Sequence, residues 1–186
     1  MQKSNLNTRK LTVMAMMLAI SVAFSFIPTF PLLPGVAYIK YEFSDLPILI
    51  STFAFGTPVG VVIAALTVAL NFVIGGAESG IYGAIMHVLA MGSYAAVAGI
   101  IYHFKKTRIG ALIGMIGGII AMTAIMIPAN LFITTYFNGM PRSVVAGLLV
   151  PAIIPANLAK GALTAVLTFI LYRYISPFLH GRTGRK

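Results

Sequence analysis

The sequence predicts an all-α protein whose helices cross a lipid bilayer six times, with both termini in the cytoplasm. Of its 186 residues, 59% are hydrophobic and 9% are charged, and the mean hydropathy is +0.98. These values lie far from those of soluble domains. Long apolar runs alternate with short polar or basic stretches, without a linker or low-complexity tract between them. We therefore expect residues 1–186 to form one integral-membrane domain.

The apolar runs define the expected helices. A bilayer core of about 30 Å needs about 20 apolar residues per helix, and residues 11–27, 81–104, 109–137 and 150–171 meet this requirement. The first run lacks a small-residue cleavage site, so we expect a retained helix rather than a signal peptide. Residues 46–75 are too long for one span and short for two. The sequence Gly56-Thr57-Pro58 interrupts them, which predicts the end of a second helix and the start of a third.

The basic residues favour six spans over five. Short cytoplasmic loops are enriched in Lys and Arg, and each added span moves the later loops to the other side. With six spans, all three basic clusters share one side. Their members are Lys3, Arg9, Lys10, Lys105, Lys106, Arg108, Arg173, Arg182, Arg185 and Lys186. The three acids, Glu42, Asp45 and Glu78, then fall at or near the outer surface.

Composition argues against several classes of function. Cysteine is absent, which excludes disulfides and cysteine-based sites, and the net charge of +10 is dispersed between apolar runs rather than gathered on a nucleic-acid-binding face. An ion-coupled transporter or channel should carry acids within its spans and often two related halves. An intramembrane enzyme needs a convergent catalytic set. We find neither pattern, so no enzyme activity, catalytic residue, cofactor or metal site is predicted.

Polar side chains within the spans are the candidate ligand contacts, because burial in a membrane is costly unless such groups are paired or face a cavity. Asn157 and Lys160 are three residues apart and share a helical face, and Asn130 has a similar setting after a proline. Alternatively, Lys160 extends toward the interface and the asparagines bond between helices. Asn71 and His87 are weaker candidates for which helix-to-helix bonding is expected, since neither has an acidic partner predicted in a nearby span.

The connection over residues 28–45 is expected on the outer side. Its prolines disfavour helix, and its Tyr38, Tyr41 and Phe43 could cover a hydrophobic cavity. Glu42 and Asp45 resemble a catalytic carboxylate pair, but we expect Asp45 to cap the following helix.

Small residues form two stripes. Ala15, Ala19 and Ala23 recur every four residues and permit close approach of another helix. This face could dock a partner or pack against a neighbouring span. The glycines at positions 110, 114, 117 and 118 form a second stripe, for which packing within the bundle is expected.

Together, the six spans, the basic cytoplasmic side, the alanine stripe and the polar last helix resemble the substrate-binding S component of energy-coupling factor (ECF) vitamin transporters. The chain most resembles the riboflavin-binding members, through FSDLP at 43–47, TFAFG at 52–56, Asn130 and IPANLAK at 154–160. The resemblance implies a high-affinity vitamin-binding subunit of a prokaryotic cell membrane. It would dock on a transmembrane coupling protein driven by two ATP-binding cassette ATPases. The chain has no phosphate-binding loop of its own.

The resemblance also implies roles for individual residues. Asn130, Asn157 and Lys160 match vitamin-binding positions of the riboflavin members. Further expected ligand contacts are Tyr41, Phe43 and Asn71. The expected contacts with the coupling protein are Ala15, Ala19 and Ala23. Riboflavin is the expected substrate, because a planar, mostly uncharged ring suits an apolar pocket with a few orienting polar groups. Pantothenate or another small vitamin is the alternative, since an anion could pair with Lys160.

Overall fold

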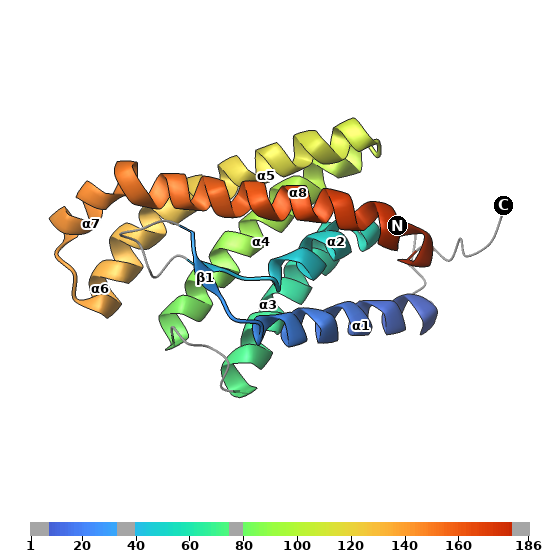
Figure 1. Ribbon diagram of the computed structural model, residues 1–186, viewed down its shortest axis with the longest axis horizontal. Helices are drawn as coiled ribbons and strands as arrows, with labels where there is room; N and C mark the ends of the chain where they lie inside the picture. Colours follow the sequence, from blue (N-terminus) through green and yellow to red (C-terminus); the bar gives the residue numbers. More distant parts are fainter. Residues whose placement is uncertain (1–7, 33–39, 75–79, 180–186) are drawn as a thin grey trace, which may run out of the picture.

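The computed structural model describes residues 8–32, 40–74 and 80–179. It contains helices and one short β-hairpin in the order α1 (Thr8–Ser25), β1 (Phe30–Pro31), β2 (Lys40–Tyr41), α2 (Asp45–Phe55), α3 (Thr57–Ile74), α4 (Gly80–Phe104), α5 (Arg108–Ala129), the π-helix η1 (Asn130–Thr134), α6 (Thr135–Asn138), α7 (Arg142–Leu148), the π-helix η2 (Leu149–Ile153) and α8 (Ile154–Leu179) (Figure 1). The strands pair antiparallel, with Phe30 opposite Tyr41.

Because α5 continues through η1 into α6, and α7 through η2 into α8, the described residues form six helical runs. This confirms the predicted all-α membrane architecture. Five runs, of 18 to 34 residues, are long and apolar enough to cross a membrane. The predicted break at Gly56 is also confirmed. Gly56 has φ 102°, which L side chains rarely adopt, and its N–H donates to the Thr52 carbonyl at 2.9 Å.

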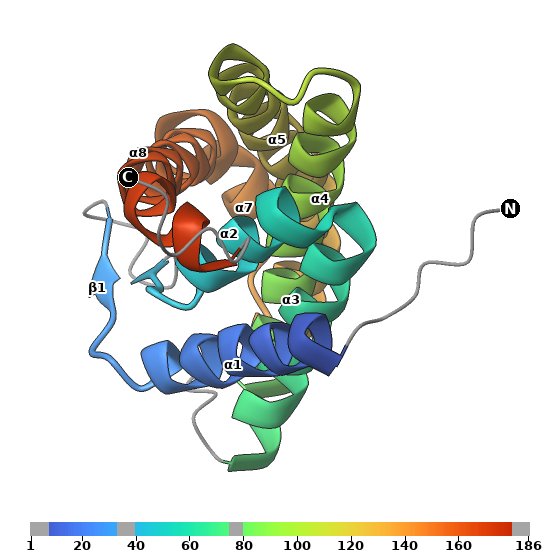
Figure 2. The ribbon, with the colours of Figure 1, turned by 90° about the vertical axis from the view of Figure 1, so that its right-hand side faces the viewer.

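Helix α2 is shorter than a span and lies at the centre of the bundle. Its 11 residues extend about 16 Å, roughly half the hydrocarbon core. In Figure 2 it is flanked by α1, α3, α4 and α8. Residues 45–53 are all buried, as expected for a helix surrounded by protein. The start of α1 and the end of α8 lie at the same end of the molecule (Figure 1).

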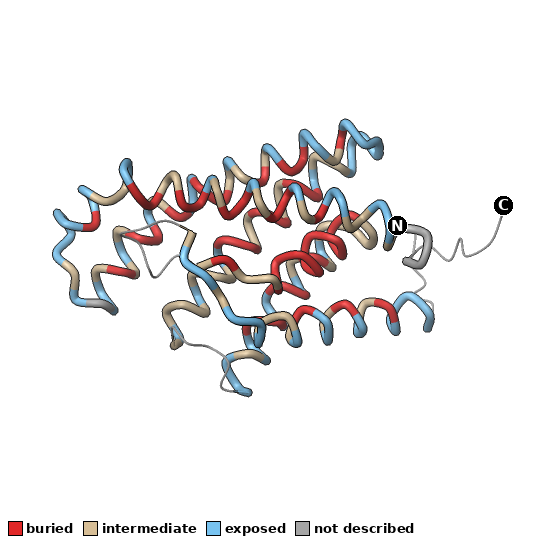
Figure 3. The backbone as a smooth tube through the Cα atoms, viewed as in Figure 1, coloured by how far each residue is buried: buried red, intermediate tan, exposed pale blue. Residues whose placement is uncertain are grey.

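The outer faces of the remaining helices are apolar. Val62 is 54% exposed, Ile120 is 61% exposed and Phe169 is 45% exposed, and Figure 3 shows such exposed positions along the outside of the bundle. Extensive apolar exposure is unfavourable in water and suits contact with lipid chains.

The glycine stripe of α5 packs within the bundle. A Cβ atom at Gly114 would lie 2.7 Å from the Ala98 carbonyl oxygen, and one at Gly118 would clash with the Tyr94 ring. Helices α4 and α5 therefore approach closely because these positions lack side chains.

Candidate ligand-binding site

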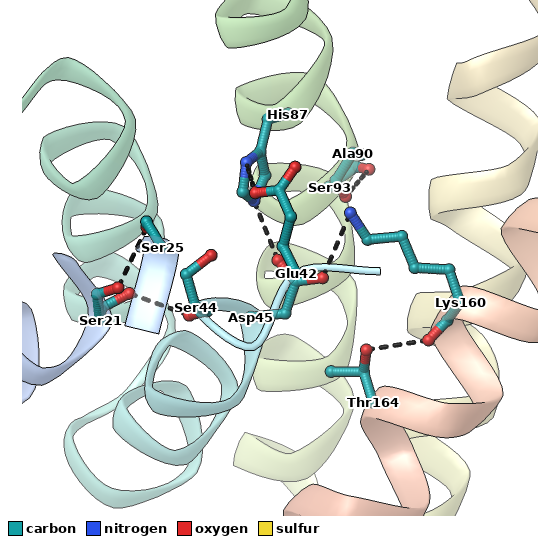
Figure 4. Close-up of polar contacts among 10 residues, drawn as sticks. All are labelled: Ser21, Ser25, Glu42, Ser44, Asp45, His87, Ala90, Ser93, Lys160 and Thr164. Carbon is teal, nitrogen blue, oxygen red and sulfur yellow. Dashed lines mark hydrogen bonds and ion pairs between the residues drawn. The ribbon is translucent and has the colours of Figure 1, made fainter. Parts of the chain in front are cut away.

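Four charged side chains meet where α2 begins, inside the bundle (Figure 4). Glu42 precedes α2, Asp45 is its first residue, His87 comes from α4 and Lys160 from α8. His87 Nδ1 lies 2.8 Å from Glu42 Oε2, and His87 Nε2 lies 2.9 Å from Asp45 Oδ1. The second Asp45 oxygen, Oδ2, lies 3.3 Å from Lys160 Nζ. We call these four residues the charged cluster.

The charged cluster is largely shielded from solvent. The Asp45 side chain is 0% exposed and that of Lys160 is 9% exposed, whereas His87 is 10% and Glu42 27% exposed. Buried charges require partners, because desolvation otherwise costs several kcal/mol per ion. Two carboxylates face one ammonium and one imidazole, so the cluster is electrically neutral when His87 is protonated.

Two groups of the segment leading into α2 have shifted pKa values. Burial acts to raise the pKa of Glu42, but attraction by His87 and Lys160 outweighs it and holds this pKa well below its usual range. Burial raises the pKa of Tyr41 to about 12. Glu42 is therefore ionised and the Tyr41 phenol neutral at physiological pH.

The cluster corrects two expectations from the sequence. Asp45 is not a helix cap: the residue at the N-cap position is Ser44, without a side-chain capping bond, and Asp45 pairs with cations instead. The expectation that His87 lacks an acidic partner is also wrong. Both expectations overlooked that the segment leading into α2 enters the bundle, where Tyr41, Ser44 and Asp45 are buried.

The side chains of the charged cluster were also considered as metal ligands. Glu42, Asp45 and His87 are residue types that can hold a metal ion, and their candidate ligand atoms lie within 4.8 Å of one another. Both ring nitrogens of His87, however, already face carboxylate oxygens at hydrogen-bonding distance, and Lys160 approaches the remaining Asp45 oxygen. This geometry favours a self-neutralised ion-pair cluster over a metal centre.

The predicted ligand residues Asn130 and Asn157 lie beside irregular turns of their helices. Asn130 begins η1, and Asn157 follows η2 by four positions; π-helical turns are frequent at functional sites. Both side chains are buried, with 0% and 3% exposure. Each Nδ2 donates to the carbonyl oxygen four residues earlier, that of Met126 at 2.7 Å and that of Ile153 at 2.8 Å. These bonds fix the orientation of both amides.

The other predicted ligand residues lie in two places. Tyr41 is fully buried, and its ring packs against Phe43 at a centroid distance of 5.2 Å and against Phe30 at 5.5 Å. Asn71 is on α3, with a buried Oδ1 that has no hydrogen-bond partner among the described residues, and no contact of the charged cluster includes it. Tyr38 and Glu78 lie outside the described residues.

A cavity of about 640 Å³ lies at the basic end of the bundle, away from these candidates. Its lining includes Lys10, Phe53, Gly56, Tyr102 and Lys106. None of the predicted ligand residues lines it.

The alanine stripe points away from the rest of the chain. Ala15, Ala19 and Ala23 are exposed, while the opposite face of α1 is buried through Val13, Met17 and Ser21. Packing against the described parts of the chain therefore does not account for the stripe.

Comparisons with known proteins agree on one family. Residues 9–172 match the family model described as ECF transporter, substrate-specific component. The chain is 30% identical over 178 residues to the riboflavin transporter RibU of Staphylococcus aureus (strain TCH60), covering 92% of each protein. It is 24% identical over 183 residues to the riboflavin transporter FmnP of Bacillus subtilis (strain 168), covering 94% of this chain and 95% of the relative.

Solved structures give the same result. A bacterial ECF transporter S component superimposes with a TM-score of 0.79 at 30% identity, covering 92% of this chain and 97% of the other. An S component for biotin from an ECF-type ABC transporter gives a TM-score of 0.62 at 17% identity, with 93% and 95% coverage, and shows the fold alone.

Proposed function

Because this chain belongs to the substrate-specific components of ECF transporters, we propose that it captures riboflavin at the membrane for import. It is a multi-pass plasma-membrane protein that serves transport and is not an enzyme. The observation that carries the proposal is the similarity to named riboflavin transporters over more than nine-tenths of the chain. The buried amides of Asn130 and Asn157 and the buried ammonium of Lys160 supply fitting chemistry.

The three proposed ligand residues suit the polar edge of a flavin ring. An amide both donates and accepts hydrogen bonds, and an ammonium has three donors. Asp45 faces one side of Lys160 Nζ, which leaves donors for a ring carbonyl or a hydroxyl. Tyr41 and Phe43, which pack edge to face, would add apolar contact.

The charged cluster favours a neutral vitamin over pantothenate. An anion bound to Lys160 would lie beside the buried Asp45 carboxylate, which already neutralises that lysine, and like charges repel strongly at low dielectric. The ion-coupled transporter is disfavoured by the family assignment, although the structure does place acids inside the bundle.

The direct test is an absorption spectrum of protein purified in detergent from cells grown with riboflavin, followed by denaturation and mass analysis of the released compound. We expect a yellow protein with near-stoichiometric flavin. Asn157→Ala should lose most of it, whereas Lys106→Met, an exposed control at the basic end, should retain it. A colourless protein that also fails to bind added riboflavin would contradict the proposal and direct attention to an uncoloured vitamin.

We further propose that the exposed alanine stripe of α1 docks on the transmembrane coupling protein, which two ATP-binding cassette ATPases drive. Small side chains permit close helix contact, and Ala15, Ala19 and Ala23 are exposed in the part of the protein that the structure describes. Ala19→Trp should preserve flavin binding and abolish uptake by cells. Ala124→Trp is the matched control, since Ala124 is exposed on α5, across the bundle from α1 (Figure 2). Normal uptake by the Ala19 variant would refute docking through this face.

Both termini are proposed to face the cytoplasm. The start of α1 and the end of α8 share one end of the bundle (Figure 1), and the flanking Arg9, Lys10 and Arg173 are exposed, as the positive-inside rule requires. Fusing a reporter that folds in the cytoplasm to either terminus should give a signal.

A further inference from the structure

His87 and Glu42 have no role in the proposed ligand contacts, yet they occupy the centre of the charged cluster. We propose that His87, in its doubly protonated form, is a positioning residue of the vitamin site and makes riboflavin affinity depend on one proton. This inference rests on the proposed riboflavin function.

The geometry around the ring requires two N–H groups. Nδ1 lies 2.8 Å from a Glu42 oxygen and Nε2 lies 2.9 Å from an Asp45 oxygen. Ionised carboxylates only accept hydrogen bonds, and a neutral imidazole has one donor. A neutral His87 would therefore present a lone pair to one of the two carboxylates, and that contact would become repulsive. The imidazolium donates to both.

His87 acts on the ligand site through Asp45. The two Asp45 oxygens are divided between His87 and Lys160, so the position of the carboxylate sets the position of the Lys160 ammonium. His87 also joins the segment before α2 to α4 through Glu42. This segment carries Tyr41, one of the proposed ring contacts. A neutral His87 keeps a single N–H, so loss of the second proton would break one of these two connections and weaken the link between the two carboxylates.

The surroundings of His87 offer few competing titratable groups. Helix α3 has no ionisable residue, and those of α1 and α5 are Arg9, Lys10 and Arg108, in the first turns of their helices. The Tyr94 hydroxyl on α4 donates to the Gly161 carbonyl at 3.2 Å. Among the described residues, the charged groups that contact His87 are Glu42 and Asp45, Lys160 contacts Asp45 from the other side, and Lys40 belongs to the same segment as Glu42.

The test is the riboflavin dissociation constant of the full-length protein in detergent, measured by flavin fluorescence quenching from about pH 6 to about pH 10. The constant should rise on the alkaline side by up to about tenfold per pH unit, as linkage to one proton requires. At about pH 6, the riboflavin dissociation constant of His87→Gln should be about tenfold higher than that of wild type, which corresponds to the loss of one charge-assisted hydrogen bond. At a pH at which His87 of the wild type is neutral, the two dissociation constants should be equal.

Glu42→Gln is the decisive variant. A neutral imidazole can donate to Asp45 through Nε2 and accept from the Gln amide through Nδ1, so the network is complete without the second proton. We expect affinity within about twofold of wild type at about pH 6 and less alkaline weakening than in the control. That control is His103→Gln, which changes an exposed histidine of the same helix and should follow wild type throughout. Ionisation of the vitamin itself weakens binding of every variant alike, so the alkaline weakening that His103→Gln shows and Glu42→Gln lacks is the part due to His87.

The outcomes separate the two proposals. If wild type binds riboflavin but His87→Gln and Glu42→Gln both keep its alkaline curve, the proton lies elsewhere and the assignment of His87 is overturned. If wild type binds no flavin at any pH, the proposed function fails and the His87 assignment fails with it. Thermal unfolding of each variant identifies misfolded protein, and should His87→Gln not fold, the pH curve of Glu42→Gln alone decides between these results.

Discussion

The ion pair between Lys160 and Asp45 permits a quantitative test of the buried cluster. Lys160→Met keeps most of the aliphatic stem and removes the ammonium, whereas Asp45→Asn keeps the shape and removes the negative charge. Lys160→Met leaves the buried Asp45 carboxylate with His87 as its remaining cationic contact, and Asp45→Asn leaves the buried Lys160 ammonium without its carboxylate. The double variant removes both charges and retains an amide oxygen that can accept from His87. We therefore expect the two substitutions to be strongly non-additive.

The expected loss of stability in these variants follows from the burial of the Lys160 and Asp45 side chains. Removing one partner of a buried pair costs about 3–5 kcal/mol. Asp45 is 0% exposed and Lys160 is 9% exposed, but Asp45 keeps its contact with His87 at 2.9 Å. The lower limit of about 3 kcal/mol is therefore expected for each single variant. The double variant should also lose about 3 kcal/mol rather than the additive value of about 6, a coupling at the upper end of measured pairs.

The assay is thermal unfolding of vitamin-free protein in detergent, because bound vitamin would add its own stabilisation. For a chain of this size 1 kcal/mol corresponds to about 2–4 °C, so each single variant should unfold about 6–12 °C below wild type. Lys106→Met, an exposed lysine, should shift stability by less than about 0.5 kcal/mol. Additivity of the two single changes within about 0.5 kcal/mol would refute the reasoning.

Three further predictions concern acid stability and helix packing. Burial opposes ionisation of Glu42, but protonated His87 outweighs burial and lowers the pKa of Glu42 in the folded state. Ionised Glu42 therefore stabilises the fold above its unfolded pKa of about 4.3, and this stabilisation is lost as the pH falls below that value. An acid titration of the melting temperature should show this loss, and Glu42→Gln should reduce it. Gly118→Leu should destabilise the protein by about 2 kcal/mol or more, because its side chain would meet Tyr94; unchanged melting would contradict close α4–α5 packing. Gly92→Ala, where an added Cβ meets nothing within 4 Å, should raise stability by about 0.5–1 kcal/mol in the same melting assay.

Much of the fold could be predicted because its signals are local. The break at Gly56 follows from a glycine and a proline two positions apart, and the close packing of α4 and α5 follows from glycines on one face. Lipid-facing helices are recognisable by hydropathy. The central position of α2 was not predictable in this way, because an 11-residue apolar helix has the same composition whether it faces lipid or protein.

The charged cluster was missed because its pairs are distant in the sequence. Asp45 and His87 are 42 positions apart, and no helical or strand periodicity relates such positions. A signal was nevertheless present in the charge balance. Two basic residues, His87 and Lys160, lie well inside predicted spans, and two acids three positions apart precede a segment that is uncharged and mainly apolar. Since intramembrane charges need partners, these acids were the available counter-ions.

The same charge balance reconciles two interpretations of Lys160. The sequence suggested a ligand contact, and the structure shows an ion pair with Asp45. An ammonium has three donors, so the two roles are compatible when the ligand contributes uncharged acceptors. They conflict when the ligand is an anion, because the cluster would then hold three negative groups against two positive ones. Under the proposed function, the buried carboxylate would therefore select an uncharged ligand, and the asparagines would orient it.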